Sequence, residues 1–181
     1  MPQHVYETRP SLTPSDVEEG PVLECPLPGS PTDQSLRIRA RRQYLASPDE
    51  VFAAWTSHLA WDSWMRLRAR SRSSVVACRG GAFRLELAEG PTIHIVSGTF
   101  LELRPPDHLT LGWQHLGDDH LSSVDVNLRT RFDRTELTLM HARIVSRREA
   151  AWLMRFWSLA LRRLSAYLSQ PAHLPSVQRA S

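Results

Sequence analysis

The sequence contains no lysine, and arginine supplies all 22 of its basic residues. Exclusive use of arginine indicates GC-rich coding, which is typical of actinobacterial genomes. The net charge is only +3, because 19 acidic residues are interspersed with the arginines. Binding of nucleic acid requires cations clustered on one surface. The scattered distribution therefore argues against a nucleic-acid partner.

Cysteine and long apolar runs are also scarce. Cys25 and Cys78 lie far apart and form no Cys-x-x-Cys pair, which argues against a disulfide framework or a cysteine metal site. No run of 18 apolar residues occurs, so we expect no membrane span. Residues 1–10 lack the apolar centre of a signal peptide. We therefore expect a cytoplasmic protein.

Catalytic and metal-binding motifs are missing as well. There is no Gly-x-Ser-x-Gly, and the eight histidines have no recognisable metal-ligand spacing. His115 and His120 flank Asp118 and Asp119, but we expect this group at a solvated hairpin tip. The sequence therefore predicts no metal, no cofactor and no catalytic residue.

The 181 residues predict one domain with two tails. Residues 1–34 hold seven of the thirteen prolines, so we expect an irregular N-terminal tail there. Residues 35–170 form the expected domain, and 171–181 form a second tail. Within the domain, Arg66, Arg68, Arg70 and Arg72 form an arginine-rich run, which we interpret as a solvated loop or edge strand.

The domain shows two hydrophobic periods. Alternation predicts strands over residues 35–45, 74–78, 83–87, 93–103, 109–114, 124–132 and 135–144. Recurrence at three and four residues predicts a long helix from about 146 to 168. Two short helices are expected over 48–55 and 58–65. A helix that covers one face of a curved antiparallel sheet gives an α+β fold of about seven strands.

Two of these helices have capping signals at their starts. Ser47 is followed by Pro48 and Glu50, which places a cap, a first-turn proline and a capping-box carboxylate in order. Ser146 and Glu149 repeat the cap and the carboxylate before the long helix. The sequence therefore predicts helix starts at 48 and 147.

Several blocks of the domain match one family in order. They are Ala46–Trp55, Trp61–Trp64, Gly80–Phe83, Gly98–Pro105, His108–Trp113 and Thr135–His141. In this order, residues 36–168 resemble the START-related (SRPBCC) superfamily, and within it the heat-shock-protein ATPase activator-like family. The resemblance implies a helix-grip fold with an apolar cavity between the sheet and the long helix.

The same family includes actinobacterial self-sacrifice proteins that protect producers of enediyne antibiotics such as calicheamicin. In those proteins, the resemblance implies, the drug diradical takes hydrogen from a backbone glycine and the chain is cut there. The resemblance thus implies binding of a bulky hydrophobic, polyketide-like molecule for antibiotic resistance. Such a protein is consumed and is not an enzyme. We expect it to act as a monomer.

The cavity and the cleavage position can be assigned to residues. The predicted cavity lining is Phe83, Leu85, Leu111, Trp113, Trp152, Phe156 and Trp157, although the same rings also suit a plain core. Gly112 is the candidate cleavage position, because a mid-strand glycine forfeits packing and leaves its Cα–H open. The simpler interpretation of Gly112 is a bulge or room for a neighbouring tryptophan. The same ambiguity applies to Gly98.

Two alternative functions stay open. A polyketide cyclase or aromatase-like protein would need an acid–base residue facing the cavity, and His94 and His141 are the candidates. A chaperone-partner module is the second alternative, although the chaperone partners of the family carry a further domain for which this length leaves no room.

Overall fold

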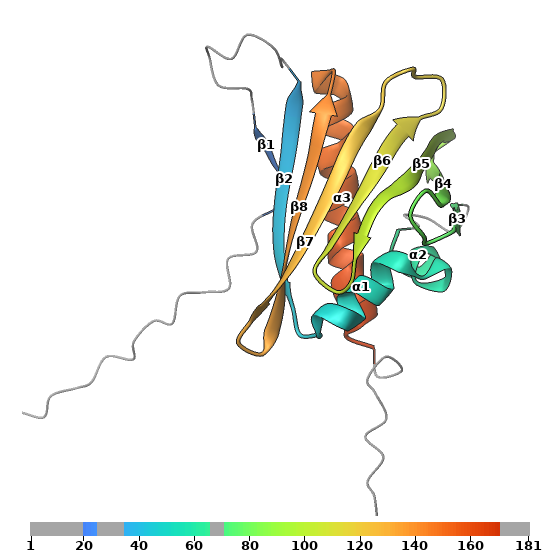
Figure 1. The fold of residues 1–181 in the computed structure, drawn as a ribbon. Helices are drawn as coiled ribbons and strands as arrows, with labels where there is room; N and C mark the ends of the chain where they lie inside the picture. Colours follow the sequence, from blue (N-terminus) through green and yellow to red (C-terminus); the bar gives the residue numbers. More distant parts are fainter. Residues whose placement is uncertain (1–19, 25–34, 66–70, 171–181) are drawn as a thin grey trace, which may run out of the picture.

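The computed structural model describes residues 20–24, 35–65 and 71–170. Within these ranges one antiparallel sheet has the strand order β1-β2-β8-β7-β6-β5-β4-β3 (Figure 1). Its strands are β1 (Val22–Glu24), β2 (Leu36–Tyr44), β3 (Arg72–Val75), β4 (Ala82–Glu89), β5 (Thr92–Arg104), β6 (His108–His115), β7 (Ser122–Arg131) and β8 (Arg134–Ile144). The helices are α1 (Pro48–Thr56), α2 (His58–Trp64) and α3 (Arg147–Leu168). No helix in the described ranges is long and apolar enough to cross a membrane.

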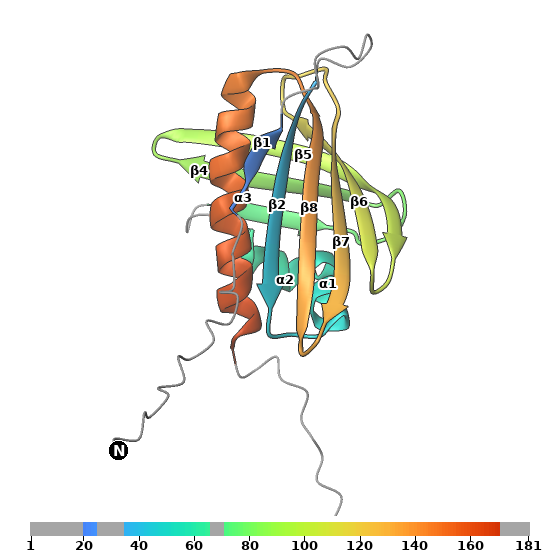
Figure 2. The ribbon, with the colours of Figure 1, turned by 90° about the vertical axis from the view of Figure 1, so that its left-hand side faces the viewer.

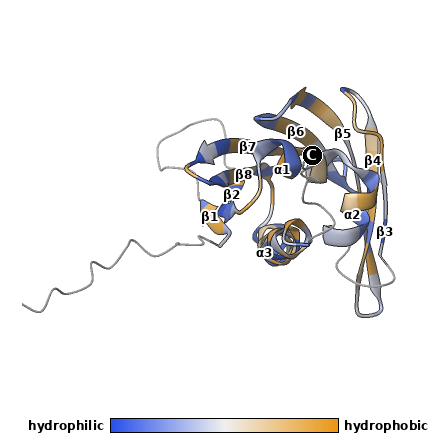
Figure 3. Cartoon of the chain, turned by 90° about the horizontal axis from the view of Figure 1, so that it is seen from below, coloured by the Kyte–Doolittle hydropathy of each residue, from blue (hydrophilic) through white to orange (hydrophobic). Residues whose placement is uncertain are grey.

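The sheet curves around α3, which lies along its concave face (Figures 2 and 3). Along β2, Ile38 and Ala40 are buried while Arg37 and Arg39 are exposed, so alternate side chains face the helix. The buried residues of α3 recur at three and four, and they are Ala150, Leu153, Phe156, Trp157, Ala160, Leu161, Leu164 and Leu168. The predicted α+β helix-grip fold is confirmed.

Both predicted helix starts are confirmed by their caps. The Ser47 amide donates to Glu50 Oε2 at 2.7 Å and the Glu50 amide donates to Ser47 Oγ at 3.2 Å, which completes a capping box. At α3, the Glu149 amide donates to Ser146 Oγ at 3.1 Å. These bonds satisfy amides that have no partner within the helix.

Helices α1 and α2 lie at the end of the grip where α3 finishes (Figure 2). The Trp61 indole N–H donates to the Trp55 carbonyl at 2.8 Å, and the Trp64 N–H donates to the Ala54 carbonyl at 2.9 Å. Trp55, Trp61 and Trp64 are fully buried. Three buried tryptophan rings, of which Trp61 and Trp64 have their indole donors paired, therefore close this end of the concave face.

Strand β1 lies inside the stretch where an irregular tail was expected. Val22 pairs with Arg39 and Glu24 pairs with Arg37, which covers the outer edge of β2. Leu23 packs against the core from the same strand. Neither proline content nor strand propensity indicates so short an element. The other residues of 1–34, the segment 66–70 with Arg66, Arg68 and Arg70, and the expected tail 171–181 lie outside the described residues.

Gly98 is required by a close approach between strands. A Cβ at Gly98 would lie 1.9 Å from the Gly112 carbonyl oxygen and 2.5 Å from the Phe83 ring. The irregularity of β5 comes further along, where the register with β6 shifts between Phe100 and Glu102. Gly98 therefore serves packing, and the bulge lies at Leu101.

Candidate functional site

Six of the seven predicted cavity residues meet in the interior of the grip. Phe83, Leu85, Leu111, Trp113, Phe156 and Trp157 are each at most 2% exposed. The Trp113 ring centroid lies 5.8 Å from that of Phe83, 5.6 Å from that of Phe156 and 5.4 Å from that of Trp157. These distances are those of packed aromatic clusters. The six side chains thus form the closed core between sheet and helix.

An open pocket of about 680 Å³ lies at the other end of the concave face, beside the first turns of α3. Its walls come from the start of β5, the β6–β7 loop and α3, and its lining residues are Thr92, Ile93, His94, Ile95, His115, Leu116, Asp118, Ser146, Arg148, Glu149, Trp152 and Arg155. Trp152 is the one predicted cavity residue that lines this pocket, which we call the Trp152 pocket.

Trp152 is half-buried and surrounded by rings. The His94 ring lies 5.1 Å from it, and the His115 ring lies 4.9 Å away in an edge-on arrangement. On its inner side Trp152 stacks on Phe156 at 5.4 Å with an interplanar angle of 9°. Phe156 in turn contacts Trp113. A continuous series of rings therefore runs from the Trp152 pocket into the closed core.

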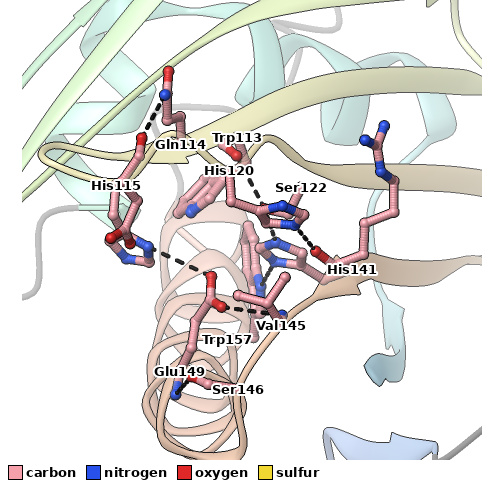
Figure 4. Close-up of polar contacts among 12 residues, drawn as sticks. Trp113, Gln114, His115, His120, Ser122, His141, Val145, Ser146, Glu149 and Trp157 are labelled. Atoms are coloured by element: carbon pink, nitrogen blue, oxygen red, sulfur yellow. Dashed lines mark hydrogen bonds and ion pairs between the residues drawn. The ribbon is translucent and has the colours of Figure 1, made fainter. Parts of the chain in front are cut away.

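The polar rim of the pocket is organised by Glu149. Its carboxylate lies 3.7 Å from His115 Nδ1 and accepts from the Val145 amide at 3.4 Å (Figure 4). Arg148 and Arg155 flank Trp152 on the same face of α3, four residues before and three after it. The pocket thus combines an aromatic platform with groups of both charges at its rim.

Beneath the pocket, a chain of buried hydrogen bonds ties α3 to three strands (Figure 4). The Trp157 indole N–H donates to His141 Nδ1 at 3.0 Å. Indole nitrogen only donates, so His141 Nδ1 carries no proton and Nε2 carries it. His141 Nε2 therefore donates to Ser122 Oγ at 2.9 Å, and Ser122 Oγ donates to the Trp113 carbonyl at 3.0 Å. Each donor in this chain has one acceptor.

These buried hydrogen bonds keep His141 neutral and occupy both of its ring nitrogens. Burial, and to a smaller extent the nearby His115, lowers the pKa of His141 from 6.5 to about 3. The only lone pair of the ring is occupied by Trp157, so His141 has no site left to accept a proton from Ser122. In the Ser122–His141 pair, the histidine therefore has the wrong tautomer to act as the base for a serine nucleophile. Of the two candidate acid–base residues, His94 is the one that lines the Trp152 pocket.

Gly112 pairs regularly with Thr99 on β5 and Ser123 on β7, so it is not a bulge. Its neighbours Leu111 and Trp113 face α3, which directs its own side-chain position to the opposite face of the sheet. A Cβ there would meet Leu121, Thr99 and Leu101 at 3.5–3.6 Å, which is ordinary contact. Nothing in the local packing therefore requires glycine at 112. Cleavage at Gly112 stays a prediction.

The other histidines near the β6–β7 loop are separated by the fold. His115 faces Trp152, whereas His120 Nε2 contacts the Arg143 carbonyl. In the part of the chain that the structure describes, no three His, Cys, Asp or Glu side chains gather in a way that could hold a metal ion.

Comparison with known proteins agrees with this fold. A family model described as Activator of Hsp90 ATPase homolog 1-like protein matches residues 45–169, well over half of the chain. The chain belongs to this family. The match covers α1, α2, the strands from β3 to β8 and all of α3, and so includes both the closed core and the Trp152 pocket.

Solved structures of the Hsp90-activator-like fold are similar over most of the chain. CalU16 from Micromonospora echinospora is 26% identical with a TM-score of 0.61, covering 84% of this chain and 85% of CalU16. DynU16, a protein of the dynemicin biosynthetic locus, is 24% identical with a TM-score of 0.60, covering 73% of this chain and 46% of DynU16. The Hsp90 activator PFC0360w from Plasmodium falciparum is 20% identical with a TM-score of 0.61, covering 75% of this chain and 97% of that protein. The last two show a shared fold. No curated protein matches the chain.

Two features of the buried interior carry no signal in the sequence. The first is Ser122, an ordinary strand serine whose hydroxyl completes the buried chain. The second is that the Trp55 and Trp113 indole N–H groups are buried and have no hydrogen-bond partner among the described residues. Alternation along a strand identifies buried positions but not which buried donor lacks an acceptor.

Proposed function

We propose that this protein binds a bulky, ring-containing hydrophobic small molecule in the Trp152 pocket. The observation that carries the proposal is the half-buried Trp152 ring, which forms the floor of an open pocket of about 680 Å³. Ligand sites of this kind are concave, roughly 300–1,000 Å³, and lined by aromatic groups with a few polar ones. Phe156 supports Trp152 from below, so the platform is held in place before a ligand arrives.

We further propose that the ligand is an enediyne-type antibiotic and that binding protects the host cell. This finer proposal is supported by the family, by the likeness to CalU16, and by the fold shared with DynU16 of the dynemicin biosynthetic locus. Sequestration requires only the pocket. Sacrificial cleavage at Gly112 requires in addition that the diradical approach from the face of Leu101 and Leu121, because the Gly112 side-chain position faces that way.

Binding is tested by titrating the protein with an uncharged polycyclic aromatic probe and with an enediyne. Replacing Trp152 by alanine removes the platform, and we expect about a fivefold to tenfold loss of affinity from the lost stacking. Leu59→Ala is the matched control, since Leu59 is 77% exposed on α2. Equal affinities in the Trp152 and Leu59 variants would overturn the proposed site.

Cleavage is tested separately by thiol activation of calicheamicin in the presence of the protein. Mass spectrometry should find two fragments that divide at Gly112, and the Gly112→Ala chain should stay whole. Fragments that divide elsewhere would move the cleavage position. An intact wild-type chain that still protects DNA would leave sequestration as the whole function.

A second candidate function is supported by His94. This histidine lines the pocket beside Trp152, where an imidazole could move a proton on a bound polyketide. In a cyclase or aromatase-like protein, His94→Gln should abolish turnover of a poly-β-ketone substrate and leave binding of the aromatic probe within about twofold. Unchanged product formation in that variant would exclude His94 as the acid–base group.

A third candidate, a chaperone partner, is supported by the family description. Capture of the heat-shock ATPase by the immobilised protein, with stimulation of its ATP hydrolysis, would establish it.

A further inference from the structure

The face of the sheet that points away from α3 carries a basic groove of about 380 Å³. Four arginines line it, Arg39 and Arg41 on β2 and Arg129 and Arg131 on β7, and we call them the arginine track. Asn127, Thr138 and Glu136 complete the lining. These arginines are scattered in the sequence and gather only because β8 places β2 and β7 on its two sides.

The register of the three strands makes the track a diagonal line. Arg41 lies opposite Thr138, and Thr138 lies opposite Asn127, whereas Arg129 lies opposite Glu136, two residues away on β8. Arg39, Arg41, Arg129 and Arg131 therefore occupy four successive steps of about 6.8 Å along the strand direction, the length of two residues. The track crosses from β2 to β7 over Glu136. A line of cations at this repeat matches an extended peptide with acidic side chains.

The charge of the track is not balanced within the sheet. Glu136 contacts Arg41 and lies 3.8 Å from Arg131, and it is buried beneath them. Arg39 and Arg129 have no carboxylate partner among the residues that the structure describes. The lining of the groove thus carries four arginines and one carboxylate, Glu136. Like charges this close repel, so a further anionic group on the track would lower the electrostatic energy.

The lining favours a peptide over a nucleic acid. Single-stranded nucleic acid binds on aromatic platforms that stack its bases. The groove residues comprise arginine, asparagine, threonine and glutamate, with no ring. Guanidinium groups pair with carboxylates in a two-pronged geometry that needs no ring.

The chain itself supplies an acidic segment at the right place. Asp16, Glu18 and Glu19 come shortly before β1 in the sequence. Val22 lies opposite Arg39 and Glu24 opposite Arg37, so the N-terminal end of β1 lies beside Arg39, at one end of the track. The six residues that precede Val22, residues 16–21, can span up to about 20 Å when extended, which is about the length of the track. Attachment through β1 also keeps the segment at a high local concentration.

We propose that residues 16–19 dock on the arginine track as an internal acidic ligand. Docking holds the N-terminal segment on the convex face of the sheet, away from the Trp152 pocket. It also makes the track a site that another carboxylate-rich peptide occupies only by displacing residues 16–19.

Cleavage by a glutamate-specific protease tests the proposal on the full-length chain. Sites after Glu18 and Glu19 should be cut roughly threefold to tenfold more slowly than the site after Glu7, as expected for a few exposed ion pairs in one tethered segment. The protection should disappear in 0.5 M salt, where screening is strong. It should also disappear in the Arg39→Gln/Arg129→Gln variant. Arg72→Gln on β3, at the opposite edge of the sheet, is the matched control and should retain it.

A binding experiment separates the internal ligand from other occupants. The Asp16→Asn/Glu18→Gln/Glu19→Gln chain should bind a labelled hexaglutamate peptide at least about threefold more tightly than the wild type, because the internal competitor is removed. Equal protease rates at all three sites in the wild type, or equal hexaglutamate affinities for the two chains, would overturn the proposal. If the Asp16→Asn/Glu18→Gln/Glu19→Gln chain binds dodecathymidylate more tightly than hexaglutamate, the assignment of the track to a peptide is wrong.

Discussion

The two ends of the aromatic series in the grip differ in how their tryptophans are held. Trp157 is fully buried and its indole donates to His141, whereas Trp152 is half-buried between His94 and His115 at an open pocket. The two residues lie on adjacent turns of one helix, and both contact the Phe156 ring, Trp152 by stacking and Trp157 edge-on. The same residue type therefore contributes mainly stability at one end and mainly recognition at the other.

The largest effect should come from removing each tryptophan in turn. Trp157→Ala leaves a cavity and an unpaired His141, so we expect a loss of about 3–5 kcal/mol in the free energy of unfolding. Trp152→Ala should cost less than about 2 kcal/mol, because part of that ring is already in water. Urea denaturation followed by circular dichroism measures both. Similar losses in the two variants would contradict the distinction between the two ends.

The closed end should also make stability depend on pH. The pKa of His141 is about 3 in the folded protein and 6.5 when exposed, so between these values the unfolded chain binds one more proton. The stability that depends on a neutral His141 is therefore fully present above about pH 6.5 and is lost as the pH drops toward 3. We expect His141 to contribute a slope of about 1.4 kcal/mol per pH unit near pH 5. His141→Asn, which keeps an acceptor for Trp157, should be less stable at pH 7 and should show a flatter slope in urea melts.

The two mid-strand glycines near the core offer a matched comparison of packing. Gly98→Ala places a methyl group against the Gly112 carbonyl and the Phe83 ring, and we expect a loss of about 2–3 kcal/mol. Gly112→Ala meets only ordinary contacts and should change the free energy of unfolding by less than about 1 kcal/mol. Thermal melts of the two variants check this order. If Gly112→Ala is the more disruptive, the outward direction assigned to Gly112 is wrong.

The smallest contrast tests the hydrogen bonds alone. Trp113→Phe and Trp157→Phe remove the same volume, but Trp113 has no acceptor among the described residues, whereas Trp157 donates to His141. We expect the Trp157 substitution to cost about 1–2 kcal/mol more, because it breaks a made bond and leaves an acceptor unpaired. Parallel urea titrations give the difference directly. Equal costs would show that the Trp157 bond contributes no net stability.

The sequence predicted most of the fold for local reasons. Ser47 and Ser146 mark helix starts by the hydrogen bonds that their side chains make within one turn, and alternation of the kind seen in Ile38 and Ala40 reports the buried face of a strand. Such signals involve residues a few positions apart. Strand β1 was missed because three residues between prolines carry no period, and they pair only because the edge of β2 is present.

The site was less accessible to prediction, because it depends on distant residues. All seven predicted cavity residues face the interior or its mouth, yet nothing in their spacing distinguishes Trp152 from Trp157. That distinction arises at the start of β5 and the end of β6, which place His94 and His115 against Trp152. The arginine track has the same origin, since Arg39 and Arg129 are 90 positions apart in the sequence and only two strands apart in the sheet.

The distribution of the six tryptophans also gives the protein an intrinsic optical reporter. Trp55, Trp61, Trp64, Trp113 and Trp157 are at 0% exposure, and Trp152 alone is half-buried at the pocket. A collisional quencher such as iodide should therefore reach one emitter of the six, and red-edge excitation should favour that emitter. Binding in the pocket can therefore be followed on the unlabelled protein through the emission wavelength of Trp152 and its accessibility to the quencher.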